Sequence, residues 1–67
     1  MVFKRIRELR EDRDWSQAAV AEKIGISQPN YSKYELGKVN IPVEMLIKLA
    51  DLYGTSVDYL VGRTDKE

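Results

Sequence analysis

The feature that most constrains the fold is a pair of short helical segments that meet at Gly25, within residues 17–36. Val20, Ala21 and Ile24 place apolar side chains at i, i+1 and i+4, a spacing that predicts an amphipathic helix. Gly25 can adopt the left-handed conformation that ends a helix at little steric cost. Helices that cross close to their junction need a small side chain at the contact, and Ala21 supplies it.

The second segment of this pair begins with a capping signal. Ser27 is a favoured N-cap residue, and Pro29 falls in the first turn, where a missing backbone N–H costs little. We therefore expect helices over about 17–24 and about 28–36. The outer face of the later helix keeps the polar and partly basic residues Gln28, Pro29, Ser32 and Lys33. A short helix with such a free face suits the major groove of DNA.

Length and composition exclude several classes of protein. Sixty-seven residues allow a single domain, residues 1–67. The sequence has no Cys and no His, so it offers neither a disulfide framework nor ordinary zinc ligands, and we expect no metal or other cofactor. A small-molecule ligand is not expected either, because the predicted helices use almost every residue. Short apolar runs and early charges predict no membrane segment and no signal peptide, hence a cytoplasmic location.

The distribution of charge matters more than its sum. Eleven basic and eleven acidic residues cancel, which at first sight argues against binding to nucleic acid. Residues 1–43, however, carry eight basic and six acidic side chains, whereas residues 44–67 carry three and five. The positive end therefore coincides with the helix pair. A neutral chain of this kind would bind DNA weakly as a monomer and lose affinity steeply with salt.

The N-terminal segment predicts another amphipathic helix, over about 3–13. Phe3, Ile6 and Leu9 share one stripe, and Arg10 lies where that stripe should continue. Arg10 is therefore expected to reach across the edge of the core to a carboxylate. Trp15 follows in the loop, either as a lid on the edge of the core or, less simply, as a DNA-stacking residue.

The C-terminal third predicts two further helices. Serine N-caps are expected at Ser16 for the helix from residue 17 and at Ser56 for a short helix over about 57–61. Before the short helix over about 57–61, a strongly apolar helix should start near Pro42 and run to about residue 53. Residues 63–67 have no apolar content and are expected to fray.

The stretch from residue 6 to residue 60 resembles the helix-turn-helix domain of lambdoid phage repressors, Cro proteins and Xre-type bacterial regulators. The matching segments are IRELRED, WSQAAVAEKIGIS, YSKYELGK and LIKLADLYGTSVDYL, in family order. The resemblance implies an all-α, compact five-helix fold of the lambda-repressor type. Its motif lies at about 17–36, and the third helix enters the major groove.

The resemblance also implies a set of DNA contacts. The positions of Gln28, Pro29, Ser32 and Lys33 face the base edges; Gln28 suits adenine, and Lys33 suits guanine or a nearby phosphate. Pro29 has no side-chain donor and would read shape or a thymine methyl group. The resemblance implies phosphate contacts for Gln17 at a helix N-terminus and for Lys38 and Asn40 in the loop after the third helix. Asn30 and Tyr31 are further phosphate-contact candidates. Arg10 and Glu35 match the internal ion pair of the family.

Some positions depart from the family pattern. Tyr31 and Tyr34 stand where aliphatic residues are usual. Each ring can belong to the core, or its hydroxyl can emerge at the rim and meet a phosphate. The stretch VNIP, at residues 39–42, lacks the more usual Ser cap after proline, which leaves the loop geometry open.

These features favour a sequence-specific transcriptional regulator, with repression as the expected action, that binds a palindromic double-stranded operator as a homodimer at the nucleoid. Its dimer surface is expected at the fifth helix and at the loop between the third and fourth helices. The apolar residues available there are Val39, Ile41, Leu60 and Val61, which could equally belong to the core.

The sequence also bears on two other classes of function. The neutral charge leaves open a protein-interaction module of antitoxin or coactivator type on the same scaffold. Catalysis is not expected, because Glu44, Asp51 and Asp58 are carboxylates on an exposed helix face without a paired, perturbed group in a cleft.

Overall fold

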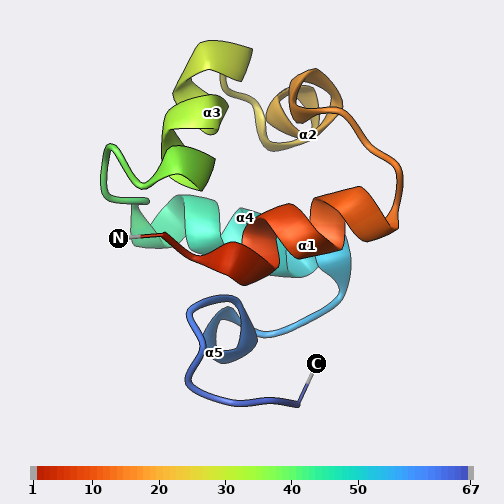
Figure 1. Ribbon diagram of the computed structural model, residues 1–67, viewed down its shortest axis with the longest axis vertical. Helices are drawn as coiled ribbons and strands as arrows, with labels where there is room; N and C mark the ends of the chain where they lie inside the picture. The colour runs from red at the N-terminus through yellow and green to blue at the C-terminus, as the bar shows by residue number, and fades with distance from the viewer. Residues whose placement is uncertain (1, 67) are drawn as a thin grey trace.

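The computed structural model describes residues 2–66, which form five α-helices and no strand (Figure 1). The helices are α1 (Lys4–Asp12), α2 (Gln17–Ile24), α3 (Gln28–Leu36), α4 (Val43–Tyr53) and α5 (Val57–Leu60). The all-α, five-helix prediction is confirmed. The predicted first helix was one residue too long at each end, and the predicted fifth helix was one residue too long at its C-terminal end, within the usual uncertainty of helix termini. None of the helices in this range is long and apolar enough to cross a bilayer.

Serine side chains begin three of the helices, as the sequence predicts. The hydroxyls of Ser16, Ser27 and Ser56 each accept a hydrogen bond from the backbone N–H three residues later, at 3.0, 3.4 and 3.0 Å. Each bond satisfies one of the amide groups that a helix N-terminus leaves unpaired. Pro42 precedes α4 without any side-chain cap, which agrees with the absence of a serine after the proline.

The turn between α2 and α3 depends on Gly25. Its φ of 79° lies in the left-handed region, and the N–H of Ile26 then bonds to the carbonyl of Ala21 at 3.0 Å. This 6→1 bond is the signature of a Schellman cap, which glycine adopts without a Cβ penalty. The helix therefore stops at Ile24, and Ser27 can cap α3 two residues after the glycine.

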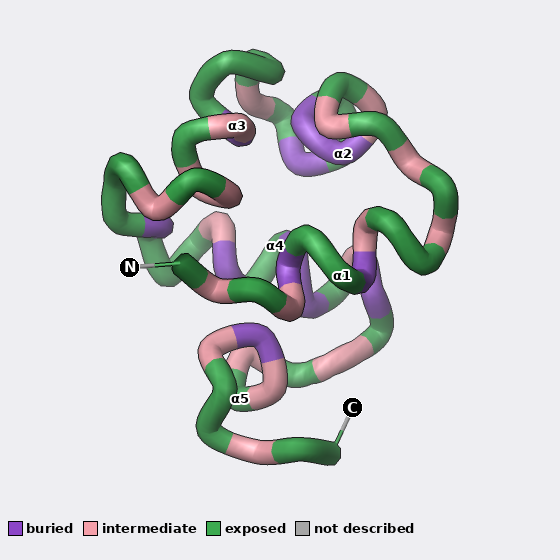
Figure 2. Tube along the Cα trace, viewed as in Figure 1, coloured by how far each residue is buried: buried purple, intermediate pink, exposed green. Residues whose placement is uncertain are grey.

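The core lies where α2 and α3 meet the layer formed by α1 and α4. Figure 1 places α2 and α3 at one end of the molecule, α1 and α4 across its middle and α5 at the other end. Figure 2 marks buried positions on all five helices. The buried residues are Ile6, Leu9, Val20, Ala21, Ile24, Tyr31, Ile41, Leu46, Leu49, Ala50, Tyr53 and Leu60. Hydrophobic burial of these residues stabilises the packing of α2 and α3 against α1 and α4.

Trp15 occupies the lid position that was one of its two predicted roles. It is half-buried and packs against the core, with its ring stacked on that of Tyr53 at 6.0 Å between centroids. The Arg13 guanidinium lies 4.9 Å from the Tyr53 ring centroid and donates to the Tyr53 carbonyl at 3.1 Å. The loop between α1 and α2 is thereby attached to the end of α4.

Arg5 connects α1 to the C-terminal segment. Its guanidinium donates to the carbonyls of Tyr59 and Thr64 and pairs with the Asp65 carboxylate at 2.8 Å. It also lies 4.1 Å from the centroid of the Tyr59 ring. The fraying expected for residues 63–67 stays a prediction, and its last residue, Glu67, lies outside the described residues.

Candidate nucleic-acid interface

The candidate interface is the outer face of α3. Gln28, Pro29, Asn30 and Lys33 are exposed, and Ser32 is half-buried. Among the described residues, α3 buries one completely, Tyr31, on the opposite side of the helix. Most of the polar face predicted to meet DNA is therefore exposed to solvent.

The end of α3 and the loop after it continue this exposed surface. Gly37 closes the helix in the left-handed conformation, and the N–H of Lys38 bonds to the carbonyl of Lys33 at 3.0 Å. The side chains of Lys38 and Asn40 are exposed. Both residues predicted to contact phosphates in this loop are thus available to a ligand.

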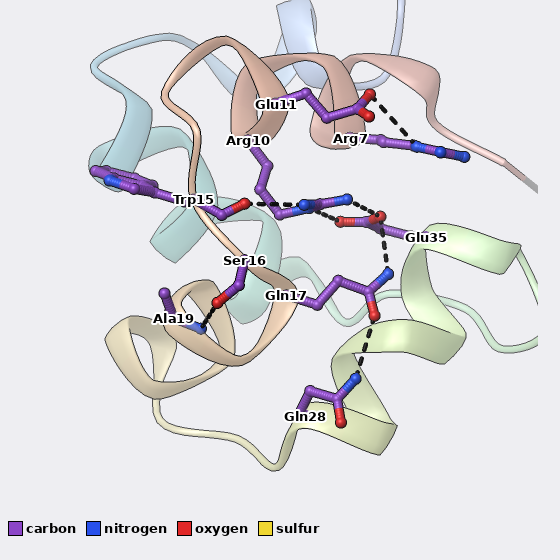
Figure 3. Close-up of polar contacts among 9 residues, drawn as sticks. All are labelled: Arg7, Arg10, Glu11, Trp15, Ser16, Gln17, Ala19, Gln28 and Glu35. Carbon is purple, nitrogen blue, oxygen red and sulfur yellow. Dashed lines mark hydrogen bonds and ion pairs between the residues drawn. The ribbon is translucent and has the colours of Figure 1, made fainter.

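The N-termini of α2 and α3 are joined by a pair of glutamines. Gln28 Nε2 donates to Gln17 Oε1 at 3.2 Å, and Gln17 Nε2 donates to Glu35 Oε1 at 3.2 Å (Figure 3). Gln17 is half-buried, whereas Gln28 is exposed. The side chain of Gln17 is thus already engaged within the motif. The donors left for a phosphate are its second amide hydrogen and the backbone N–H groups at the start of α2 that Ser16 does not cap.

Arg10 and Glu35 form a bidentate ion pair between α1 and α3. Arg10 Nε lies 2.8 Å from Glu35 Oε2, and Arg10 Nη2 lies 3.1 Å from Glu35 Oε1. Only 13% of the Arg10 side chain and 4% of the Glu35 side chain are exposed. Arg10 Nη1 also donates to the Trp15 carbonyl at 2.9 Å, so one guanidinium ties together α1, the following loop and α3.

The environment of Glu35 favours its ionised form. Burial by itself would raise the pKa of the Glu35 carboxyl, but the hydrogen bonds from Arg10 and Gln17, together with the neighbouring Tyr31 hydroxyl, outweigh it and lower the pKa below its ordinary value. For Arg10 the hydrogen bond to Glu35 raises the pKa further. The pair is therefore fully charged at neutral pH.

The prediction that Tyr31 contacts a phosphate is wrong. Its exposed fraction is 0%, and its hydroxyl is buried without a hydrogen bond of normal geometry among the described residues. Burial raises the pKa of this hydroxyl, and the neighbouring Glu35 carboxylate raises it further. A side chain in that position belongs to the core. Tyr34, which is half-buried, is the tyrosine of α3 that reaches the rim.

The apolar residues expected at a dimer surface divide between core and surface. Ile41 and Leu60 are 9% and 1% exposed and belong to the core, so they are not available to a partner. Val61 is half-buried, and Val39 is 42% exposed. Sequence reasoning missed two neighbours on α4, Val43 and Ile47, which are 67% and 48% exposed and lie one helical turn apart.

The chain from Glu35 through Gln17 to Gln28 was also not predicted as a unit. The sequence contained a signal for it, because Gln17 and Gln28 are each the first residue of a helix in a motif whose helices cross. Two helix starts on one side of a crossing bring long side chains within reach. Periodicity alone does not reveal this, since it describes one helix at a time.

The architecture and the exposed α3 face define a helix-turn-helix domain, and comparison with known proteins places the chain in that class. The model of a helix-turn-helix family matches residues 6–60, and the chain belongs to this family. The P22 c2 repressor, solved in complex with a synthetic operator, superposes with a TM-score of 0.82. That match has 29% sequence identity and covers 91% of this chain and 94% of that one.

Curated relatives include regulators of bacteria and phages. The chain is 42% identical over 65 residues to YobD, an uncharacterized HTH-type transcriptional regulator of Bacillus subtilis, covering 97% of this chain and 58% of that protein. It is 40% identical over 62 residues to RstR, a cryptic phage transcriptional repressor of Vibrio cholerae, covering 92% of this chain and 55% of that protein. The chain thus spans little more than half the length of these relatives.

Proposed function

We propose that this chain binds double-stranded DNA as part of a sequence-specific transcriptional regulator, and that it acts as a repressor on a palindromic operator. The observation that carries the proposal is the polar face of α3, exposed along Gln28, Pro29 and Lys33 and fixed from behind by the Arg10–Glu35 ion pair. A helix of this length fits the major groove, where side chains at its N-terminal end reach base edges.

Two sets of residues divide the work on DNA. Gln28, Pro29, Ser32 and Lys33 face the bases and supply sequence discrimination. Phosphates are bound by the α2 N-terminus with Gln17, and by Asn30, Lys38 and Asn40 at the two ends of α3. Tyr34, rather than Tyr31, is the tyrosine of α3 that lies at the rim of this DNA-binding surface.

A homodimer doubles these contacts. One recognition helix covers a few base pairs, whereas two related by a twofold axis, about 34 Å apart, read a palindrome. The surface that supports dimerisation consists of Val39 in the α3–α4 loop, Val43 and Ile47 on α4, and Val61 after α5. The exposed apolar side chains of Val39, Val43 and Ile47 on a small domain favour contact with a second copy.

A footprint on the region upstream of the gene tests the proposal. We expect protection of two half-sites at low salt, loss of discrimination at one base position in Gln28→Ala, and a similar local effect in Lys33→Ala. No binding at low salt, or equal binding to a scrambled duplex, would contradict DNA recognition. Such a result would favour the alternative of a protein-interaction module.

Sedimentation velocity tests the dimer separately. The double variant Val43→Gln, Ile47→Gln should shift the protein toward monomer, while Leu36→Gln should not. Leu36 is a matched control because it is also an exposed aliphatic residue, at 58%, but lies at the end of α3 outside the proposed surface. An unchanged monomer–dimer equilibrium in the double variant would move the dimer surface elsewhere.

A further inference from the structure

The side chains that run from the ion pair to the exposed end of α3 form one directed hydrogen-bond chain (Figure 3). Glu35 Oε1 accepts from Gln17 Nε2, and Gln17 Oε1 accepts from Gln28 Nε2, both at 3.2 Å. The chain starts at a carboxylate that is 4% exposed and ends at a side chain on the DNA-facing surface. It therefore connects the interior of the domain to a residue proposed to read a base.

The direction of this chain follows from its first member. An ionised carboxylate can only accept hydrogen bonds, so Gln17 must turn its NH₂ group toward Glu35. The carbonyl oxygen of the same amide then faces Gln28, which must answer with its own NH₂ group. The reverse orientation of Gln17 would place its carbonyl oxygen against the carboxylate. Neither amide can turn over alone without losing a hydrogen bond or opposing two acceptors.

This order leaves Gln28 with a defined set of free groups. One of its two Nε2 hydrogens is used by Gln17, and the other hydrogen and Oε1 remain available. One donor beside one acceptor complements adenine in the major groove, which presents the N7 acceptor and the N6 donor. Guanine presents the two acceptors N7 and O6 at the same edge, and a single remaining donor can satisfy only one of them.

We propose that Glu35 is a positioning residue for base recognition, because it fixes the amide orientation of Gln28 through Gln17 and thereby favours adenine over guanine at the base that Gln28 reads. The proposal rests on the DNA-binding function proposed above. It gives Glu35 a role beyond its ion pair with Arg10, since the hydrogen bonds that the Arg10 side chain donates go to the Glu35 carboxylate and the Trp15 carbonyl, not to either glutamine amide.

The test compares variants that separate the two roles of Glu35. Glu35→Gln removes the obligate acceptor, because a glutamine can present either end of its amide to Gln17. Arg10→Gln removes the ion pair but keeps the carboxylate. Arg10→Gln with Glu35→Gln removes both charges and leaves no buried arginine unpaired, which guards against loss of folding by the single Glu35 variant. Circular dichroism verifies that each protein is folded at the temperature used.

Each variant selects from a pool of DNA duplexes randomised over one operator length, and the bound fraction is sequenced. The base that Gln28 reads is the one whose preference disappears in Gln28→Ala. There we expect the adenine-to-guanine ratio to fall about tenfold in both proteins that lack the carboxylate, the loss of one good bidentate contact. Arg10→Gln should bind more weakly yet keep the wild-type ratio.

The outcomes distinguish the two proposals. An unchanged ratio in the variants without the carboxylate, or an equal fall in Arg10→Gln, would overturn the positioning role while leaving DNA recognition intact. No enrichment of any sequence by the wild-type protein would overturn both, because Gln28 would then have no base to read. In the free protein, the Gln28 side-chain amide signals should move with Glu35→Gln and Gln17→Ala but not with Arg10→Gln.

Discussion

The Glu35 carboxylate connects α3 to two other helices. It receives two hydrogen bonds from Arg10 on α1 and one from Gln17 on α2, although it belongs to α3 itself. A buried ion pair need not add much net stability, because desolvation offsets the attraction. Its value here is geometric: it holds the recognition helix in one position relative to the two helices beside it.

The ionisation of Glu35 predicts how stability depends on pH. Its pKa is lower in the folded chain than the ordinary value of 4.5, so the folded state stabilises the charged form. That contribution is present above about pH 4.5 and is lost as the pH falls through the lowered pKa. Urea unfolding between pH 7 and pH 3 should show this loss. The slope should be shallower in Glu35→Gln, and an identical slope in both proteins would assign the acid sensitivity to other carboxylates.

Removal of the Tyr31 hydroxyl tests whether this residue belongs to the core rather than to the DNA-binding surface. Its hydroxyl is buried without a normal hydrogen bond, which costs free energy that Phe would not incur. We expect Tyr31→Phe to leave the free energy of unfolding unchanged or raise it by about 1 kcal/mol. DNA affinity should be unaffected, since the hydroxyl cannot reach a phosphate.

Tyr34→Phe is the matched control for Tyr31→Phe, because the same hydroxyl is removed from a half-buried position on the same helix. We expect this variant to weaken binding modestly to all sequences. A loss of affinity in Tyr31→Phe with none in Tyr34→Phe would restore the phosphate contact first predicted for Tyr31.

At the scale of the helices, the angle between α2 and α3 depends on a left-handed glycine. Gly25 has a φ of 79°, and a Cβ built there would meet nothing within 4 Å, so substitution carries a backbone cost without a clash. Gly54 between α4 and α5 has a φ of 67° and equally open surroundings. Alanine at either position should lower the free energy of unfolding by about 1–2 kcal/mol.

The difference between the two glycine variants should appear in DNA binding. Gly25→Ala strains the junction that sets the recognition helix, whereas Gly54→Ala strains a junction remote from it in the chain. Under conditions where both are fully folded, Gly25→Ala should bind operator more weakly, as measured by fluorescence anisotropy. Equal affinities would mean that the α2–α3 angle tolerates the strain.

Local signals explain why the helices could be predicted so closely. Ser16, Ser27 and Ser56 are caps whose partners lie three residues away, and Gly25 ends α2 by its own backbone preference. Such signals act within one turn and are visible in the sequence. The Arg10–Glu35 pair was predictable from a polar residue in an apolar stripe combined with the family resemblance.

Other features depend on how the helices cross, and these could not be predicted. Tyr31 has a polar group that fits either core or rim, and tertiary packing decides between them. Ile41 and Leu60 are apolar residues in short segments without a clear period, so their burial became visible only in the assembled fold. The Gln17–Gln28 contact likewise requires the relative placement of two helix starts.

For the whole molecule, zero net charge makes the salt dependence of DNA binding the most informative measurement. A phosphate-binding dimer releases counterions, so the logarithm of affinity should fall linearly with the logarithm of salt concentration. Each phosphate contact contributes about 0.9 to that slope, and a dimer uses each residue twice. Lys38→Gln should therefore reduce the magnitude of the slope by about 2 and weaken binding similarly to all sequences.

The control for this measurement is Lys66→Gln, which removes the same charge from an exposed position far from α3 in the chain. At ordinary ionic strength, salt screens the interaction between exposed charges that lie more than about 10 Å apart. The effect of Lys66→Gln on the slope should therefore be small. Equal changes in both variants would mean that affinity follows overall charge rather than a phosphate contact at the α3–α4 loop. A change of about 1 instead of 2 for Lys38→Gln would indicate that one copy of the chain binds the site.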